Sequence, residues 1–92
     1  MGKKIVINRC FGGFGIKEEF LSKMGYSYDF DVPRDDPEFI KLLETYGSEA
    51  ISDSLARLVI VEIPDGATDY RITDYDGLES VTAVVNGKIV DL

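Results

Sequence analysis

The chain has 92 residues, 45% of them hydrophobic and 29% charged, which is typical of one small globular domain covering residues 1–92 and not of a disordered segment. Its formal net charge of −7 predicts no direct binding to nucleic acid, because phosphates require a basic surface. No apolar run is long enough to cross a membrane or to act as a signal peptide, so neither is expected. A single cysteine, Cys10, fits a reducing cytoplasm.

The first predicted elements are a strand, a glycine-rich turn and a helix. Residues 4–8 are mostly β-branched and apolar, which is typical of a strand that is buried on at least one face. Residues 9–15 contain three glycines and predict a turn. From Ile16 to Met24 apolar residues recur at helical spacing, and Gly25 is expected to end this helix.

The next segment, residues 26–32, alternates aromatic or apolar residues with polar ones and predicts a short strand or an extended connection. A second helix is predicted to begin at Pro37, with Asp36 as its N-cap, and to end at Gly47. Residues 48–54 are polar and weakly patterned, so we expect a loop, with one helical turn left open.

The remaining sequence predicts strands at residues 56–63, 69–75, 80–85 and 88–90. Asn86-Gly87 is typical of a two-residue hairpin turn, because both positions require positive φ. The predicted order is β-α-(β)-α-β-β-β-β. We therefore expect an α+β fold with a small, mainly antiparallel sheet and two helices packed on one face.

The glycine-rich turn is a candidate anion site formed by Gly12, Gly13, Phe14 and Gly15. A strand, a glycine turn and a helix N-terminus together offer backbone N–H groups to a small anionic ligand. Specific phosphate motifs do not match, because Lys17 and Glu18 stand where a P-loop and a dinucleotide fingerprint need glycine. The alternative is a tight turn that packs Phe11 and Phe14 into the core. Either way, at least one of these glycines should have positive φ.

Catalytic chemistry is not indicated. The sequence contains no histidine, so Cys10 lacks the usual general base. Most zinc sites and catalytic triads also need histidine and are therefore not expected. Asp76-Gly77 fails as a calcium loop, because the positions of the first and last ligands would fall on Ile72 and Ala83. We assign no catalytic residue, no metal and no cofactor.

Six acidic residues lie within residues 62–79 and are expected to share one edge of the strands and their turns: Glu62, Asp65, Asp69, Asp74, Asp76 and Glu79. Such an edge, with Tyr70 or Tyr75 beside it, would attract a basic protein surface. The candidate interaction residues are Asp74, Tyr75, Asp76 and Glu79. The alternatives are that the acids serve solubility and that the tyrosines lie at the margin of the core.

With these segments in view, the chain resembles a family of small phage and prophage proteins of uncharacterised function. The matching blocks are Ile5-Val6-Ile7-Asn8-Arg9-Cys10-Phe11-Gly12-Gly13-Phe14-Gly15, Arg34-Asp35-Asp36-Pro37, Ile60-Val61-Glu62-Ile63-Pro64-Asp65-Gly66 and Asp74-Tyr75-Asp76-Gly77-Leu78-Glu79. Lys17 departs from the family pattern, in which a serine tends to start the first helix. The resemblance implies a phage or prophage origin and a cytoplasmic location in a bacterial host, and it transfers no ligand or activity.

Two functions therefore remain open at the level of sequence. One is an accessory interaction module that binds a basic host protein surface, and the other is a module that binds a small anion at Gly12–Gly15. The position of the positive charges discriminates between them. If Lys3, Arg9 and Lys17 converge on the glycine turn, the anion hypothesis gains. A homo-oligomer is compatible with the sequence without being indicated by it.

Overall fold

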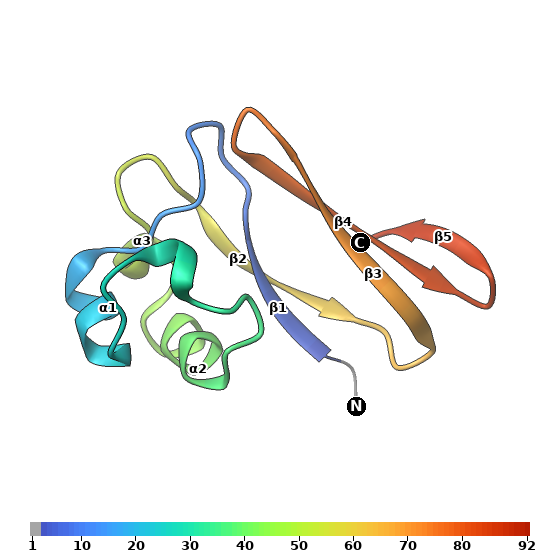
Figure 1. Cartoon of the computed structure of the whole chain (residues 1–92), viewed down its shortest axis with the longest axis horizontal. Helices are drawn as coiled ribbons and strands as arrows, with labels where there is room; N and C mark the ends of the chain where they lie inside the picture. Colours follow the sequence, from blue (N-terminus) through green and yellow to red (C-terminus); the bar gives the residue numbers. More distant parts are fainter. Residues whose placement is uncertain (1–2) are drawn as a thin grey trace.

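The computed structural model describes residues 3–92, and it has the expected α+β class. Figure 1 shows the elements in chain order: β1 (Lys3–Asn8), α1 (Glu18–Met24), a short 3-10 helix (Asp29–Asp31), α2 (Pro37–Tyr46), α3 (Ser48–Ile51), β2 (Leu58–Ile63), β3 (Ala67–Tyr75), β4 (Leu78–Val85) and β5 (Lys88–Asp91). All strand pairs are antiparallel.

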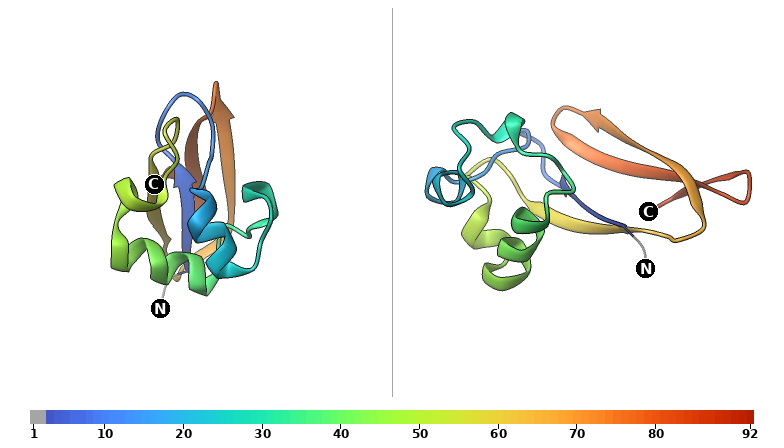
Figure 2. Two further views of the ribbon diagram at one scale, coloured as in Figure 1. Left: turned by 90° about the vertical axis from the view of Figure 1, so that its left-hand side faces the viewer. Right: turned by 60° about the horizontal axis from the view of Figure 1, so that its bottom comes forward.

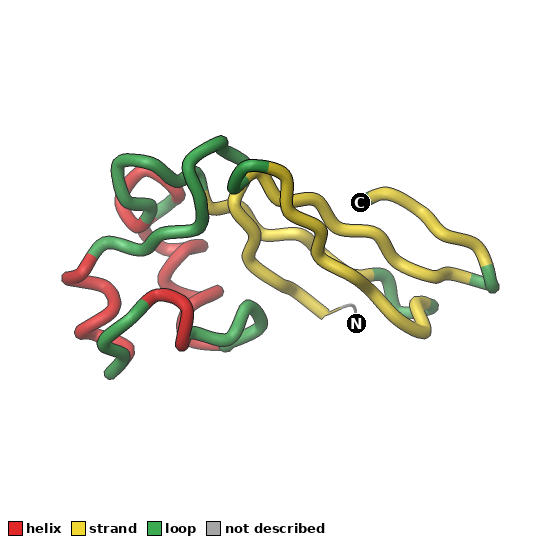
Figure 3. The backbone as a smooth tube through the Cα atoms, turned by 45° about the horizontal axis from the view of Figure 1, so that its top comes forward, coloured by secondary structure: helices red, strands yellow, loops and turns green. Residues whose placement is uncertain are grey.

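The strands divide into two sheets. β1 pairs with β2, and β3, β4 and β5 form a second sheet in that order. The helices pack on one side of the β1–β2 pair, and the second sheet covers its other side (Figures 1 and 2). The tube in Figure 3 shows the same separation, with the helices gathered at one end and the strands at the other. The molecule is therefore layered, with the two-stranded sheet in the middle.

The alternation of side chains along β1 explains this arrangement. Val6 belongs to a buried cluster with residues of the helices, such as Phe39. Ile5 and Ile7 point the other way and pack in a second cluster with Val81 of β4. All three β1 side chains are fully buried, so both faces of the strand need a cover. The predicted packing of the helices on one face is confirmed, whereas the strands form two sheets instead of one, because the apolar β1 requires a layer on each side.

Several local predictions are confirmed. Asp36 Oδ1 accepts hydrogen bonds from the N–H groups of Glu38 at 2.9 Å and Phe39 at 3.2 Å, so it caps α2 as expected. Helix α1 begins after Lys17 without a side-chain cap and ends at Gly25, whose φ is 83°. α3 supplies the helical turn that the sequence left open.

The C-terminal hairpin is also confirmed. Asn86 has φ 53° and Gly87 has φ 77°, the left-handed conformation that this turn requires. The turn places Val85 opposite Lys88 and continues the pairing through β5.

Residues 26–32 do not form a strand. Their centre is the short 3-10 helix, in which the rings of Tyr28 and Phe30 stack at a centroid distance of 5.2 Å and an interplanar angle of 18°. Both rings are exposed. The two aromatics lie two positions apart, a spacing that also occurs along one face of a strand, so alternation alone could not distinguish the two structures.

Candidate functional site

Three loops meet at one end of the molecule, on the upper side of Figure 1. They are the glycine loop (residues 9–15), the loop of residues 53–56 and the β3–β4 turn (residues 74–77), and we call them together the three-loop end. The N–H of Gly12 donates a hydrogen bond to the carbonyl oxygen of Asp76 at 3.2 Å. A Cβ at Gly12 would lie 2.7 Å from the carbonyl oxygen of Leu55, so all three loops touch around this glycine.

The glycines of the three-loop end are required by these contacts. Gly12 and Gly13 have φ of 130° and 104°, which confirms the prediction of positive φ in the glycine loop. Gly77, with φ 89°, faces the backbone of Gly13 so closely that a side chain there would collide with it. The carboxylate of Asp53 occupies the space that a Cβ at Gly15 would need. Close packing at Gly12, Gly15 and Gly77, together with the positive φ of Gly13, therefore accounts for the glycine content.

The positive charges do not converge on the glycine loop. The guanidinium of Arg9 donates to the carbonyl oxygen of Leu92 at 3.1 Å. Lys17 donates to the carbonyl oxygen of Glu49, and Lys3 lies 3.0 Å from the carboxylate of Asp35. Because Asp53 also places an acidic group beside Gly15, this geometry does not favour an anion at Gly12–Gly15.

The two phenylalanines of the glycine loop differ in environment. Phe14 packs edge-to-face on Phe39, with ring centroids 6.1 Å apart, and the guanidinium carbon of Arg34 lies 3.7 Å from the Phe14 ring centre. Phe11 is 60% exposed, so the expectation that both rings enter the core is wrong for Phe11. Gly12, the next residue, lies against Leu55 and Asp76 at the surface, and Phe11 remains outside the core.

Glu79 belongs to the interior and not to an acidic edge. It is only 6% exposed, and its carboxylate accepts hydrogen bonds from Arg34 Nη1 at 2.6 Å and Nη2 at 2.8 Å. The N–H of Asn8 donates to the same carboxylate at 2.7 Å. A carboxylate that is buried with these donors is unavailable to a partner, so Glu79 is removed from the interaction residues.

Asn8 connects this buried network to the three-loop end. Its side-chain amide donates to the carbonyl oxygens of Cys10 and Gly77 at 2.8 and 2.7 Å. Its side-chain oxygen accepts from the N–H of Arg57 at 2.8 Å. One buried side chain thus ties together the bases of all three loops, which fixes the positions of the residues at their tips.

The six acids do not share one edge. Asp74 and Asp76 lie at the β3–β4 turn, and both are exposed. Asp65 and Asp69 lie at the opposite end of β3, beside Lys3. The prediction of one acidic edge is therefore wrong, because β3 spans nine residues and separates its two ends. The smaller group at the β3–β4 turn remains.

Large apolar side chains accompany these two acids. Phe11, Leu55 and Tyr75 are 60%, 62% and 73% exposed, and each comes from a different loop of the three-loop end. Sequence reasoning selected Tyr75 but assigned Phe11 to the core and passed over Leu55. The signal that could have found Leu55 is its position as a lone large apolar residue in a polar segment, residues 52–55.

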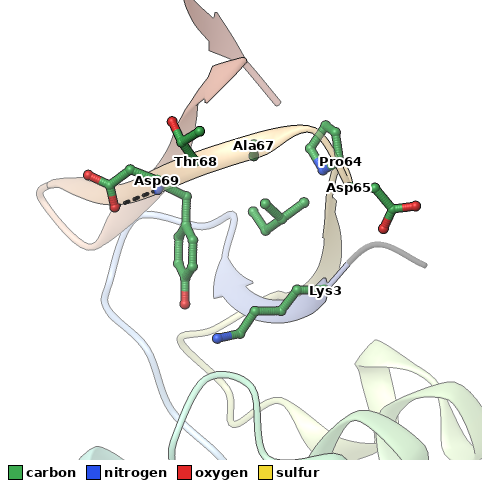
Figure 4. Close-up of a pocket in the computed structure, with 8 residues that line it drawn as sticks. Lys3, Pro64, Asp65, Ala67, Thr68 and Asp69 are labelled. Atoms are coloured by element: carbon green, nitrogen blue, oxygen red, sulfur yellow. Dashed lines mark hydrogen bonds between the residues drawn. The ribbon is translucent and has the colours of Figure 1, made fainter. Parts of the chain in front are cut away.

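A separate cavity of about 340 Å³ lies at the other end of β3 (Figure 4). Eight residues line it: Lys3, Ile63, Pro64, Asp65, Ala67, Thr68, Asp69 and Tyr70. The ammonium group of Lys3 lies 5.4 Å from the ring centre of Tyr70 and is paired with Asp35. That pairing raises the pKa of Lys3 and lowers the pKa of Asp35. The cation of this cavity is already neutralised, so the cavity does not offer a convergent set of ligand groups.

Within residues 3–92, no group of three or more potential ligand side chains is placed to hold a metal ion. None of the helices in that range is both long and apolar enough to span a membrane.

Comparisons of the chain with models of protein families, with curated proteins and with solved structures found no match. The resemblance to phage and prophage proteins stays a prediction.

Proposed function

We propose that the chain is a small protein-interaction module that binds a basic protein surface through its three-loop end. One observation carries the proposal: Phe11, Leu55 and Tyr75 are exposed on loops whose backbones touch, next to the acidic residues Asp74 and Asp76. Binding surfaces commonly combine apolar or aromatic anchors with a charged surround.

The rigidity of the three-loop end supports this role. Side chains held on an ordered backbone lose less conformational entropy when they bind than those on a mobile loop. The hydrogen bonds of Asn8 and the close approach of Gly77 to Gly13 provide that order. The apolar groups would supply most of the affinity, and the acids would speed association with a positively charged partner.

The resemblance to phage and prophage proteins gives this module a setting. It supports an accessory protein that acts in the cytoplasm of a bacterial host, on a host protein with a basic surface.

Affinity capture from a bacterial lysate, followed by kinetic measurements on the captured protein, tests the proposal. The double variant Leu55→Ala/Tyr75→Ala should weaken binding by about tenfold or more, as for anchor residues of an interface. The matched control is Ile89→Ala, which removes an exposed apolar side chain from β5, outside the three-loop end, and should leave binding unchanged.

The acidic contribution is tested separately. Asp74→Asn/Asp76→Asn should slow association and flatten its dependence on salt, whereas Glu18→Gln/Glu19→Gln on α1 should not. Glu79 is left unchanged, because its role is internal. A partner whose binding is indifferent to both three-loop variants would overturn the proposal.

A further inference from the structure

The two outer edges of the β1–β2 sheet differ in their hydrogen bonding. On the β1 side, the N–H of Val6 donates to the carbonyl oxygen of Arg34 at 2.8 Å, and Arg34 Nη1 donates back to the carbonyl oxygen of Val6 at 3.1 Å. The N–H of Asn8 is satisfied by Glu79. The edge of β1 is therefore occupied at Val6 and at the N–H of Asn8. No strand within residues 3–92 pairs with the other edge of β2.

The pairing pattern identifies which groups point toward the open edge. Arg9 N–H donates to the carbonyl oxygen of Arg57, so residues 57, 59, 61 and 63 direct their backbone groups toward β1. Residues 58, 60 and 62 direct theirs outward. The outward N–H of Leu58 is taken by Ser52 Oγ at 2.8 Å. Ile60 and Glu62 thus present both an N–H and a C=O on the open edge.

Solvent exposure agrees with an open edge. Ile5, Val6 and Ile7 in β1 are fully buried. Their partners directly across the ladder, Val61, Ile60 and Val59, are each partly exposed. Helix α2 contacts both strands, whereas the second sheet contacts mainly β1, through β4, so the exposure of β2 reflects this thinner cover together with its unpaired side. The strand also lacks the usual protection of an edge, because it contains no proline and no bulge and its only charged residue is Glu62.

We propose that this edge binds a second copy of the chain, with the two β2 strands antiparallel and related by a two-fold axis through Val61. In this register Ile60 lies opposite Glu62 of the second copy, and Glu62 lies opposite its Ile60. Each such pair exchanges N–H···O=C bonds in both directions, so every outward group of Ile60 and Glu62 gains a partner. The pairing joins the two-stranded sheets of both copies into one continuous sheet.

The side chains fit the same register. Val61 lies opposite Val61 of the second copy, and Val59 lies opposite its Ile63, so apolar groups meet on the face shared with the second sheet. On the other face Glu62 lies opposite Ile60 of the second copy and keeps Lys4 as its neighbour within its own chain. A register shifted to centre on Ile60 would pair Glu62 with Leu58, whose N–H is already occupied. The register about Val61 pairs Ile60 with Glu62 and moves Leu58 out of the paired segment, opposite Pro64 of the second copy, one residue beyond the end of β2.

The salt dependence of this association is opposite to that of the proposed function. Each copy carries a net charge of −7, so two copies repel one another and added salt should strengthen their pairing. Binding of a basic partner at the three-loop end should weaken with salt. Failure of either proposal can therefore be recognised without reference to the other.

Sedimentation velocity with the full chain tests the pairing over micromolar to millimolar concentrations. The decisive variant is Glu62→Pro, which removes the outward N–H without removing a hydrogen bond to β1. The matched control, Glu62→Ala, removes the same side chain and keeps the N–H. Glu62→Pro should weaken dimerisation about tenfold or more relative to Glu62→Ala. A chain that stays monomeric throughout, or a dimer equally strong in both variants, overturns the proposal.

Disulfide cross-linking gives a second measurement that holds if Glu62→Pro does not fold. In a Cys10→Ser background, Val61→Cys should form an intermolecular disulfide. The two copies of residue 61 form a non-hydrogen-bonded pair, and the Cα atoms of such a pair lie about 4.5 Å apart. Glu62→Cys should not, because the two copies of residue 62 are diagonal neighbours at roughly 7–8 Å. Cross-linking of both variants to the same extent, or of neither, contradicts the register.

Discussion

Arg34 holds Glu79 through paired hydrogen bonds of 2.6 and 2.8 Å across 45 residues of chain. The guanidinium also contacts the ring of Phe14 and the carbonyl oxygen of Val6. This ion pair therefore joins β4 of the second sheet to β1 and to the glycine loop. No other charged pair that the structure describes is as deeply buried on its acidic side.

Glu79→Gln should lower the free energy of unfolding by about 2–4 kcal/mol, because it leaves the Arg34 guanidinium facing a neutral amide in a mostly buried site. Urea denaturation followed by circular dichroism measures the change. The control is Glu19→Gln on the exposed side of α1, which should change stability by less than about 0.5 kcal/mol. Equal effects of the two substitutions would show that Glu79 is not a buried partner of Arg34.

Gly77→Ala and Gly87→Ala separate the cost of positive φ from the cost of collision. Both glycines have positive φ, 89° and 77°, so both substitutions incur a conformational cost of about 1 kcal/mol. A Cβ at Gly87 meets open space, whereas one at Gly77 collides with the backbone of Gly13. Gly77→Ala should therefore be clearly more destabilising in thermal unfolding. Equal unfolding midpoints for the two variants would show that the three loops are not in contact.

Tyr26 donates a hydrogen bond from its hydroxyl to Asp36 Oδ2 at 3.0 Å, and this bond to a carboxylate raises the pKa of Tyr26. The folded chain thus holds the phenol proton more tightly than the unfolded chain does. The resulting stabilisation is complete below the unfolded pKa of about 10 and is lost as the pH rises through the folded pKa.

Asp36→Asn should bring the pKa of Tyr26 back toward its ordinary value while preserving the cap of α2, because asparagine is also a favoured N-cap. An NMR titration of ring-labelled tyrosine measures it. Asp31→Asn is the control, since Asp31 makes the smallest contribution to the shift and its loss should change the pKa far less. A Tyr26 pKa that responds equally to both variants would contradict the assignment.

At the start of β2, Ser52 Oγ accepts a hydrogen bond from the N–H of Leu58 at 2.8 Å, and both residues are buried. Ser52→Ala should cost about 1–3 kcal/mol, because it leaves that N–H without a partner. Ser54→Ala, two residues away and exposed, should be nearly neutral. Chemical denaturation of the two variants measures the difference, and the Leu58 amide proton should exchange faster with solvent only in Ser52→Ala.

The features that the sequence predicted correctly are those set by neighbouring residues. Asp36-Pro37 specified the start of α2, and Asn86-Gly87 specified the last hairpin, because each depends on backbone conformation within a few positions. The positive φ of Gly12 and Gly13 was predictable for the same reason.

The division into two sheets and the interior position of Glu79 depend on residues far apart in the chain. Glu79 shares one face of β4 with Val81 and Ala83, a period-2 signal that sets it apart from the exposed Asp74 and Asp76. Its partner Arg34, however, belongs to another segment and could not be inferred from spacing. Asn8 gave a partial signal as a polar residue that ends an apolar strand, yet its contacts with residues 10, 57 and 77 could not be inferred from spacing. The candidate site was therefore predicted only in its β3–β4 turn.

The buried carboxylate of residue 79 also constrains the order of events during folding. β1 appears first during synthesis, but its pairing strand lies some fifty positions later, and the acid that satisfies Asn8 and Arg34 comes later still. A nascent chain that ends before β4 would leave the Arg34 charge without its counter-charge and the side of β1 that carries Ile5 and Ile7 open to water. We therefore expect no stable N-terminal intermediate on the ribosome: the chain acquires its structure in one cooperative step, once β4 has emerged.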